Sequence, residues 1–169
     1  MREPRGGTHV RTRRQTLLGR LACIRHDFVG SYGDESRGGR RDRQRVKSAY
    51  SLNETIVRLK QDIADKGIKF FDEIDQSKLA AAAGIRLRPS TLLIFGNPPL
   101  GALFLTSNPA AGLDWPVRLL VLEDEKGEVW ALYTDFSWIA HRHGIKDRDA
   151  AFKMATNVIS SITSSVTAK

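Results

Sequence analysis

Apolar and polar residues follow regular patterns from about Val46 to the end of the chain. The first clear pattern is helical, with apolar residues at Leu52, Ile56, Leu59 and Ile63. Ser51 precedes it with Glu54 three residues later, which is a capping-box arrangement, and Gly67 stands where glycine commonly ends a helix. We therefore predict a helix between Ser51 and Gly67, preceded by a weak strand signal in 46–50.

Further along the chain, short apolar runs separated by turn residues indicate strands. The clearest pair is 117–123 and 128–135, joined by a turn that contains Gly127, and two more strands are expected at 68–74 and 92–95. Short helical patterns occur at 76–84, 100–106 and 137–143, and a longer C-terminal helix begins near Asp147. The predicted fold class is α+β, an antiparallel sheet of about five strands with helices mainly on one face. The expected order is strand, helix, four strands and helix, with short extra helices.

The strand 117–123 is largely apolar on both of its faces. Val117, Leu119 and Val121 point to one side, whereas Leu120 and Leu122 point to the other. One layer of helices cannot cover both sides, and a large exposed apolar surface is unusual for a monomer. We expect further segments or a second subunit to cover the remaining face, and a homodimer is the expected assembly.

Charge divides the chain into two parts. Residues 1–45 contain 12 Arg, no Lys and 5 acidic residues, a net charge of +7 out of +8 for the whole chain. This segment is rich in Arg and Gly and poor in apolar residues, so we predict that it is a disordered extension. Two interpretations stay open: a mis-assigned start, with translation beginning near Val46, or an arm that contacts nucleic-acid phosphates without sequence preference. Residues 46–169 are expected to form a single α+β domain.

The rest of the composition excludes several classes of protein. The part after residue 45 is nearly neutral, so no specific nucleic-acid partner is expected. The only cysteine, Cys23, cannot form an internal disulfide. The apolar run 21–24 lies between Arg20 and Arg25 and is too short for a signal peptide or a membrane span. We expect a cytoplasmic protein without a membrane partner.

Motifs of common cofactor enzymes do not occur. The sequence has no P-loop, dinucleotide fingerprint, nucleophile elbow or HExxH motif, so we expect no cofactor. His141 and His143 are two residues apart, and residues at this spacing point to different sides of a helix. No metal site is therefore expected there.

The segment 97–116 is predicted to be a mostly irregular loop, and long ordered loops often carry function. Asn97 and Asp114 flank it beside prolines, and their ordinary role there is to cap turns. The functional hypothesis is that they line a small pocket that binds a ligand. Its candidate residues are Asn97, Phe104, Asp114, Trp115 and Tyr133.

Two local motifs connect this loop with a known family. Phe95-Gly96-Asn97-Pro98 and Leu113-Asp114-Trp115-Pro116, the latter just before the hairpin, resemble the bacterial family called domain of unknown function 302. The resemblance covers about 46–159. It implies a fold of the TATA-binding-protein type, with an antiparallel sheet and helices on one side, and it implies association as dimers. It brings no established reaction, ligand or catalytic residue. Trp115 stands where a leucine is common in the family.

Three hypotheses about function follow. The first is a small dimeric domain of unknown function that binds a small molecule or a protein partner. The second is a hydrolase or isomerase that uses Asp114 or a histidine, although no catalytic motif is recognised and spacing alone cannot establish the geometry. The third is a non-specific nucleic-acid contact through the N-terminal arm.

Overall fold

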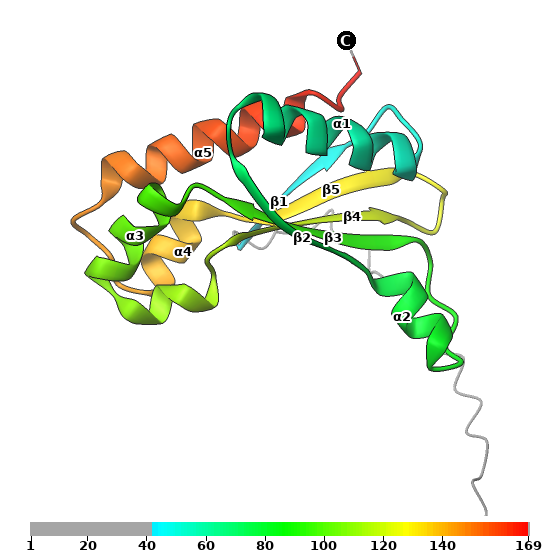
Figure 1. The fold of residues 1–169 in the computed structure, drawn as a ribbon, viewed down its shortest axis with the longest axis horizontal. Helices are drawn as coiled ribbons and strands as arrows, with labels where there is room; N and C mark the ends of the chain where they lie inside the picture. The colour runs from blue at the N-terminus through cyan, green and yellow to red at the C-terminus, as the bar shows by residue number, and fades with distance from the viewer. Residues whose placement is uncertain (1–41, 169) are drawn as a thin grey trace, which may run out of the picture. The chain divides into compact units, whose positions relative to one another are not determined.

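An antiparallel sheet with the strand order β1-β5-β4-β3-β2 is the centre of the structure (Figure 1), a computed structural model that describes residues 42–168. The strands are β1 (Arg43–Lys47), β2 (Lys69–Asp75), β3 (Ser90–Gly96), β4 (Val117–Glu123) and β5 (Val129–Thr134). The helices are α1 (Leu52–Asp65), α2 (Gln76–Ala82), α3 (Pro98–Ser107), the 3-10 helix η1 (Pro109–Leu113), α4 (Phe136–Arg142) and α5 (Asp149–Ser164). The predicted α+β class and the order of its elements are confirmed.

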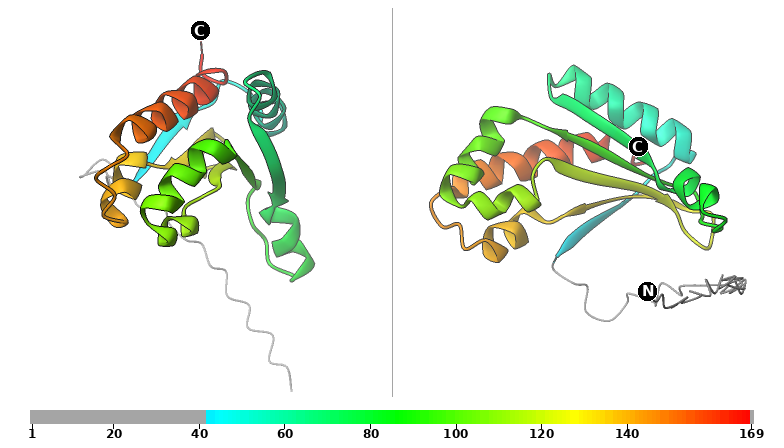
Figure 2. Two further views of the ribbon diagram at one scale, coloured as in Figure 1. Left: turned by 60° about the vertical axis from the view of Figure 1, so that its left-hand side comes forward. Right: turned by 60° about the horizontal axis from the view of Figure 1, so that its bottom comes forward.

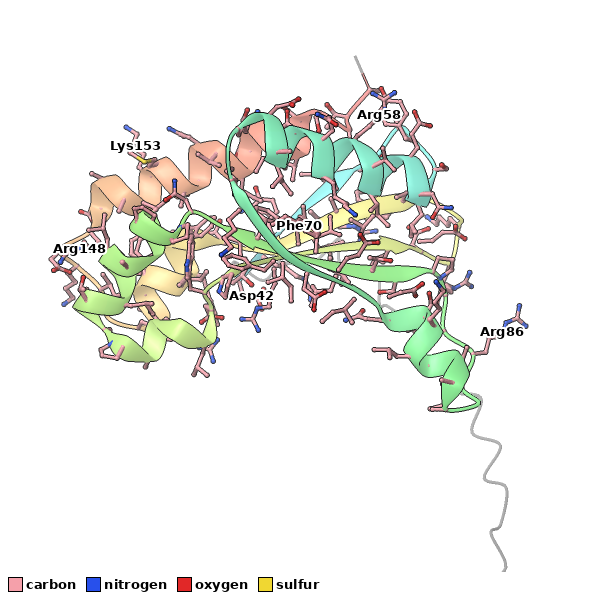
Figure 3. All side chains as sticks on the ribbon, viewed as in Figure 1. Asp42, Arg58, Phe70, Arg86, Arg148 and Lys153 are labelled. Carbon is pink, nitrogen blue, oxygen red and sulfur yellow. The ribbon has the colours of Figure 1, made fainter. Side chains whose placement is uncertain are left out.

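The two long helices lie side by side on one face of the sheet, as Figures 1 and 2 show. Their apolar residues meet the inward-facing residues of the central strands, and these form the core. The completely buried members are Leu59 and Ile63 of α1, Leu93, Leu119, Val121 and Ala131 of the sheet, Ile162 of α5, and Val166, which follows α5. Phe70 packs against this core, whereas Arg58 and Lys153 lie on the outer sides of α1 and α5 (Figure 3).

Local signals at the helix ends agree with the sequence in part. The Oγ of Ser51 accepts the Glu54 N–H and begins α1, and Gly67 follows the end of α1 with a φ of 64°, as predicted. Two other boundaries differ. The helix expected at 137–143 begins at Phe136, because the Asp135 carboxylate accepts the amides of its first turn and caps it. Helix α5 begins at Asp149, two residues later than expected.

The segment 97–116 is not mostly irregular, which corrects the prediction. It contains α3 and η1, and each begins with a proline, which fits the first turn of a helix because no intrahelical N–H is needed there. Asn97 and Asn108 supply the cap before each proline. Proline and asparagine therefore start helices here instead of breaking structure.

The ordered domain begins earlier than residue 46. Strand β1 starts at Arg43 and pairs with β5 from Arg43↔Thr134 to Lys47↔Trp130. Side chains strengthen this edge: Gln44 Nε2 donates to Asp135 Oδ2 at 2.6 Å, and the Arg45 guanidinium lies 3.7 Å from the centre of the Trp130 ring. The expectation of disorder for the preceding residues, 1–41, lies outside the described residues.

Candidate functional site

Asn97 serves the start of α3. Its Oδ1 accepts the Leu100 N–H at 3.2 Å, and Pro98 occupies the first helical position. This is the ordinary capping role of asparagine. The predicted site residue therefore has a structural partner that accounts for it.

Phe104 and Trp115 contact each other, as the pocket hypothesis requires, but they fill the space between them. Phe104 is 3% exposed, stacks on Phe152 with ring centres 4.3 Å apart, and meets Trp115 edge to face at 5.5 Å. The indole of Trp115 also lies against the α3 backbone at Gly101, where an added Cβ would be 1.9 Å from Nε1. These aromatic rings pack against one another and against α3 at the end of the core, so Phe104 and Trp115 have structural partners.

Tyr133 lies on the helix-covered face of β5 and is 8% exposed. Burial raises the pKa of its phenol, although a hydrogen bond with Ser160 of α5 acts in the opposite direction. The side chain therefore helps to hold α5 on the sheet. It does not share a cleft with Asp114.

Asp114 has the most unusual environment of the five predicted residues. Its side chain is 6% exposed and meets three basic side chains, which we call together with it the Asp114 cluster: Asp114, Arg118, Arg142 and His143. Arg118 Nη2 lies 3.1 Å from Oδ1, and Arg142 Nη1 lies 3.2 Å from Oδ1 and 3.0 Å from Oδ2. His143 Nε2 lies 2.7 Å from Oδ2. Both carboxylate oxygens are therefore occupied.

The cluster connects segments that are distant in the sequence. Asp114 follows η1, Arg118 is the second residue of β4, and Arg142 and His143 stand at the end of α4. A backbone contact supports the same connection, because Asn108 Nδ2 donates to the His143 carbonyl oxygen at 2.8 Å. The cluster thus fixes the loop before β4 against α4.

Geometry at this cluster does not favour acid–base catalysis. A general base must reach a proton of its substrate, but the His143 side chain is 5% exposed and directs Nε2 at the carboxylate. The exposed parts of the cluster are the two arginines, whose side chains are 46% and 43% exposed. The arrangement holds guanidinium groups at the surface, and this makes it a candidate for binding.

Sequence reasoning found Asp114 and a histidine but not the two arginines. Arg118 gave a signal, since it is the only charged residue within the apolar run 117–122. Arg142 gave none, because it is 28 positions from Asp114 and comes near it only through the packing of α4.

A second candidate region is the face of the sheet opposite α1 and α5. Residues on this face alternate with the buried residues of the same strands, and they are only half-buried. We define the open face by its apolar side chains: Ile74 of β2, Leu92 and Ile94 of β3, Leu120 and Leu122 of β4, and Trp130 and Leu132 of β5. No helix layer among the described residues covers them (Figures 1 and 2).

Comparison with known protein families shows which family this fold belongs to. A family model described as domain of unknown function DUF302 matches residues 44–162. The chain belongs to this family. A crystal structure of an uncharacterized conserved DUF302 protein from Bacillus stearothermophilus has the same fold, with a TM-score of 0.62 and 18% identity, and the likeness covers 73% of this chain and 94% of that one.

Relatives with a functional name are similar over part of their length. The DUF302 chain is 38% identical over 100 residues to the Fluoride-specific ion channel FluC 1 of Brucella suis biovar 1 (strain 1330) and of Brucella abortus biovar 1 (strain 9-941). The match covers 59% of this chain but only 39% and 37% of the two channel chains. Within residues 42–168, no helix has the length and apolar character needed to cross a membrane.

Helix α2 extends from the DUF302 domain on the side of the open face (Figures 1 and 2). None of its residues is buried. Together with the segment that follows, it exposes Leu79 and Ile85, each 63% accessible, and Leu87, which is 47% accessible. We call residues 76–88 the α2 arm. Its apolar side chains have no core of their own to enter.

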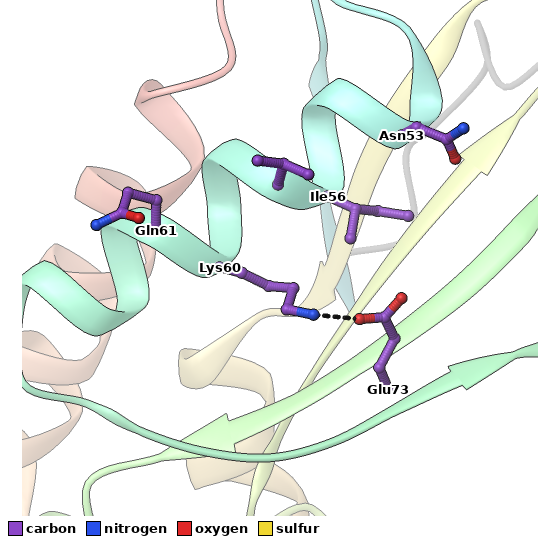
Figure 4. Close-up of a pocket in the computed structure, with 6 residues that line it drawn as sticks. Asn53, Ile56, Lys60, Gln61 and Glu73 are labelled. Atoms are coloured by element: carbon purple, nitrogen blue, oxygen red, sulfur yellow. Dashed lines mark hydrogen bonds and ion pairs between the residues drawn. The ribbon is translucent and has the colours of Figure 1, made fainter.

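A groove of about 490 Å³ lies between α1 and β2 at the edge of the domain (Figure 4). Its lining residues are Asn53, Ile56, Val57, Lys60, Gln61 and Glu73. Lys60 Nζ and Glu73 Oε2 are 2.7 Å apart and join the helix to the strand. Because its two charged groups pair with each other, the groove offers no uncompensated charge, and none of the five predicted site residues lines it.

Proposed function

We propose that this DUF302 domain is a binding module that works as a homodimer, with a second copy covering the open face. The observation that carries the proposal is a five-stranded sheet whose second face is apolar but has no helix layer. Contiguous apolar surface of this kind typically marks an interface in a soluble protein. A second copy supplies a matching apolar surface by symmetry.

Charges at the two edges of the sheet support one orientation of the copies. On the open-face side, β1 carries Arg45 and Lys47, which pair within the chain with Asp124 at 3.4 Å and Glu128 at 2.5 Å. At the other edge, β2 carries Asp72. A two-fold axis parallel to the strands places the β1 edge of one copy over the β2 edge of the other. Basic residues then face an acidic one. An axis across the strands would instead bring like charges together.

The α2 arm supports the same assembly. Helix α2 lies on the side of the open face, where a second copy would be (Figure 1), and the arm exposes Leu79, Ile85 and Leu87. In the dimer, the arm of each copy extends along the edge of the other copy and shields these side chains from water. The combined surface is then self-complementary, as an isologous interface requires.

Sedimentation velocity of the full chain and of Leu120→Glu tests the proposal. Leu120 is central to the open face, so a charge there should convert a dimer at micromolar concentration into a monomer. Val57→Glu is the matched control, because Val57 is 66% exposed on the outer side of α1 and should leave the dimer intact. A monomeric wild-type chain, or an unchanged dimer in folded Leu120→Glu, would contradict the proposal.

The channel relatives favour a second candidate function, which is the binding of a protein partner. The match spans less than half of the relatives' chains and includes no membrane-spanning helix among the described residues of this one, so it favours an accessory domain over a pore. We infer that the partner is a channel subunit of this kind. Fluoride efflux from vesicles containing a purified Brucella-type channel should change when the chain is added. Unchanged efflux at an excess of the chain would exclude this partner.

A further inference from the structure

Two arginines from different elements meet on one buried carboxylate, and we propose that they form a binding site for a small oxyanion. Arg118 comes from β4 and Arg142 from the end of α4, and a nitrogen of each lies within 3.2 Å of Asp114 Oδ1. The guanidinium groups are therefore neighbours. The chemical class of the ligand is a carboxylate or a phosphate group. Arg118 projects from β4 on the same side as Leu120, so the site borders the open face, but it is complete within one chain and does not need the second copy.

The cluster has more donors than the carboxylate can use. A guanidinium has five N–H groups. Arg118 uses Nη2 for Asp114 and for the Leu113 carbonyl oxygen, and Arg142 uses Nη1 for Asp114. Within the described part of the chain, the other N–H groups of these two side chains have no hydrogen-bond partner, and both side chains are more than two-fifths exposed. They are available to a ligand from solvent.

The balance of charge attracts an anion. Two guanidinium groups are always protonated and one carboxylate opposes them, so one positive charge is in excess even when His143 is neutral. The negative charge lies behind the positive ones, because Asp114 is 6% exposed whereas the arginines reach the surface. An approaching anion therefore meets the cations first.

Space at the cluster suits a small polar group. A narrow cleft of about 10 Å³ is lined by Asp114, Val117, Arg118, Thr134, Phe136 and Ile139. This is about the space that one water molecule needs. Asp114 lines this cleft and Arg142 does not, so the anion binds at the mouth, where the guanidinium groups are exposed. Paired N–H groups of arginine match the geometry of a carboxylate or phosphate.

Asp114 acts as a positioning residue for this site. Arginine has a long side chain, and ordering it at the moment of binding costs conformational entropy. Here Asp114 already fixes one side of both guanidinium groups, and Trp138 supports Arg142, whose guanidinium carbon lies 5.2 Å from the ring centre. The donors are therefore ordered before the ligand arrives.

Titration of the isotope-labelled full chain, followed by the arginine Nε–H signals in NMR, tests the site. Sodium phosphate and sodium acetate form two arms, each at constant ionic strength maintained with sodium chloride, and they distinguish a phosphate ligand from a carboxylate. We expect saturable shifts in at least one arm. Arg118→Gln and Arg142→Gln should each weaken binding about tenfold, the loss of about one charge-assisted hydrogen bond. Arg86→Gln, on the exposed α2 arm, is the matched control and should bind as the wild type (Figure 3).

A second measurement covers variants that fail to fold. Phenylglyoxal modifies accessible arginines, and mass spectrometry of the wild-type chain locates the modified positions. The anion should slow modification of Arg118 and Arg142 but not of Arg86. Shifts that do not saturate in either arm, or equal protection of all three arginines, would overturn the proposal. Leu120→Asn adds no charge beside Arg118, so a monomeric Leu120→Asn protein should keep its affinity, and failure of the dimer and failure of this site then give different results.

Discussion

The two faces of the sheet differ in what covers them, although their side chains are similar. On β4, Leu119 is completely buried under the helices, and the next residue, Leu120, is half-buried on the open face. Strands covered on one side usually alternate apolar and polar residues. Strand β4 is apolar on both sides except for Arg118 and its last residue, Glu123, so its composition is typical of a strand that is covered on both faces. The described residues supply the first cover, and we propose that a second copy supplies the other.

The largest change in the free energy of unfolding should come from a charge placed on the face of the sheet that the helices cover. Ile159 of α5 is 2% exposed, so Ile159→Asp would bury an unpaired carboxylate and should lower the free energy of unfolding by at least about 3 kcal/mol. Met154 lies on the same helix and is 57% exposed. Met154→Asp is therefore the control, and urea unfolding should show almost no change. Similar losses in both variants would mean that α5 is not docked on the sheet as described.

Alanine substitutions of two neighbouring leucines on β4 allow a direct comparison of the two faces. Leu119→Ala removes a completely buried side chain and should cost about 2–5 kcal/mol of unfolding free energy, including the cavity that remains. Leu120→Ala should cost much less in a dilute, monomeric sample, because its side chain keeps contact with water. Unfolding at two protein concentrations checks this. The cost of Leu120→Ala should rise with concentration, whereas that of Leu119→Ala should not. Equal costs at both concentrations would remove the distinction between the faces.

Much of the covered face was predictable because local signals determine it. The Ser51 cap, the apolar spacing of α1 and Gly67 act within one helix, and the hairpin from β4 to β5 follows from a turn and two apolar runs. The start of β1 was not predictable, because Arg43–Lys47 is polar and becomes a strand through pairing with β5. A similar limit applies to α3, whose Asn97-Pro98 start also fits a turn.

Of the candidate site, only Asp114 could be predicted from its local sequence. Asp114 stood out because it lies beside Trp115 and Pro116, but its partner Arg142 is 28 positions away. Their contact depends on how α4 closes the end of the sheet, which periodicity does not encode. Asn97, Phe104 and Tyr133 do not line the cleft beside Asp114, because Asn97 caps a helix and the two aromatic residues are packed in the core.

Gly101 tests how tightly the end of the core is closed. A Cβ at this position would lie 1.9 Å from Trp115 Nε1, so Gly101→Ala must displace the indole. We expect a loss of about 1–3 kcal/mol, the usual cost of overpacking, although alanine favours helix more than glycine does. Replacing Trp115 with leucine should rescue part of this loss, and a double-mutant cycle by urea unfolding measures the coupling. Additive effects of the two substitutions would show that the side chains do not compete for the same space.

The smallest effect is expected where β1 meets α4, at the margin between the two faces. Burial raises the pKa of Asp135, but hydrogen bonds from Ser137, Gln44 and the first amides of α4 outweigh it and hold the pKa below its ordinary value of 3.8. A carboxyl whose pKa is lower in the folded state contributes stability above its unfolded pKa and loses it as the pH falls through the folded pKa. Asp135→Asn keeps a good cap but loses an acceptor, so it should cost about 0.5–1.5 kcal/mol at pH 7. The difference from the wild type should shrink as the pH falls below about 4. Urea unfolding of the wild type and of Asp135→Asn from pH 7 to pH 2.5 measures this difference in unfolding free energy. A difference that stays constant over this range would mean that the charge of Asp135 does not stabilise this junction.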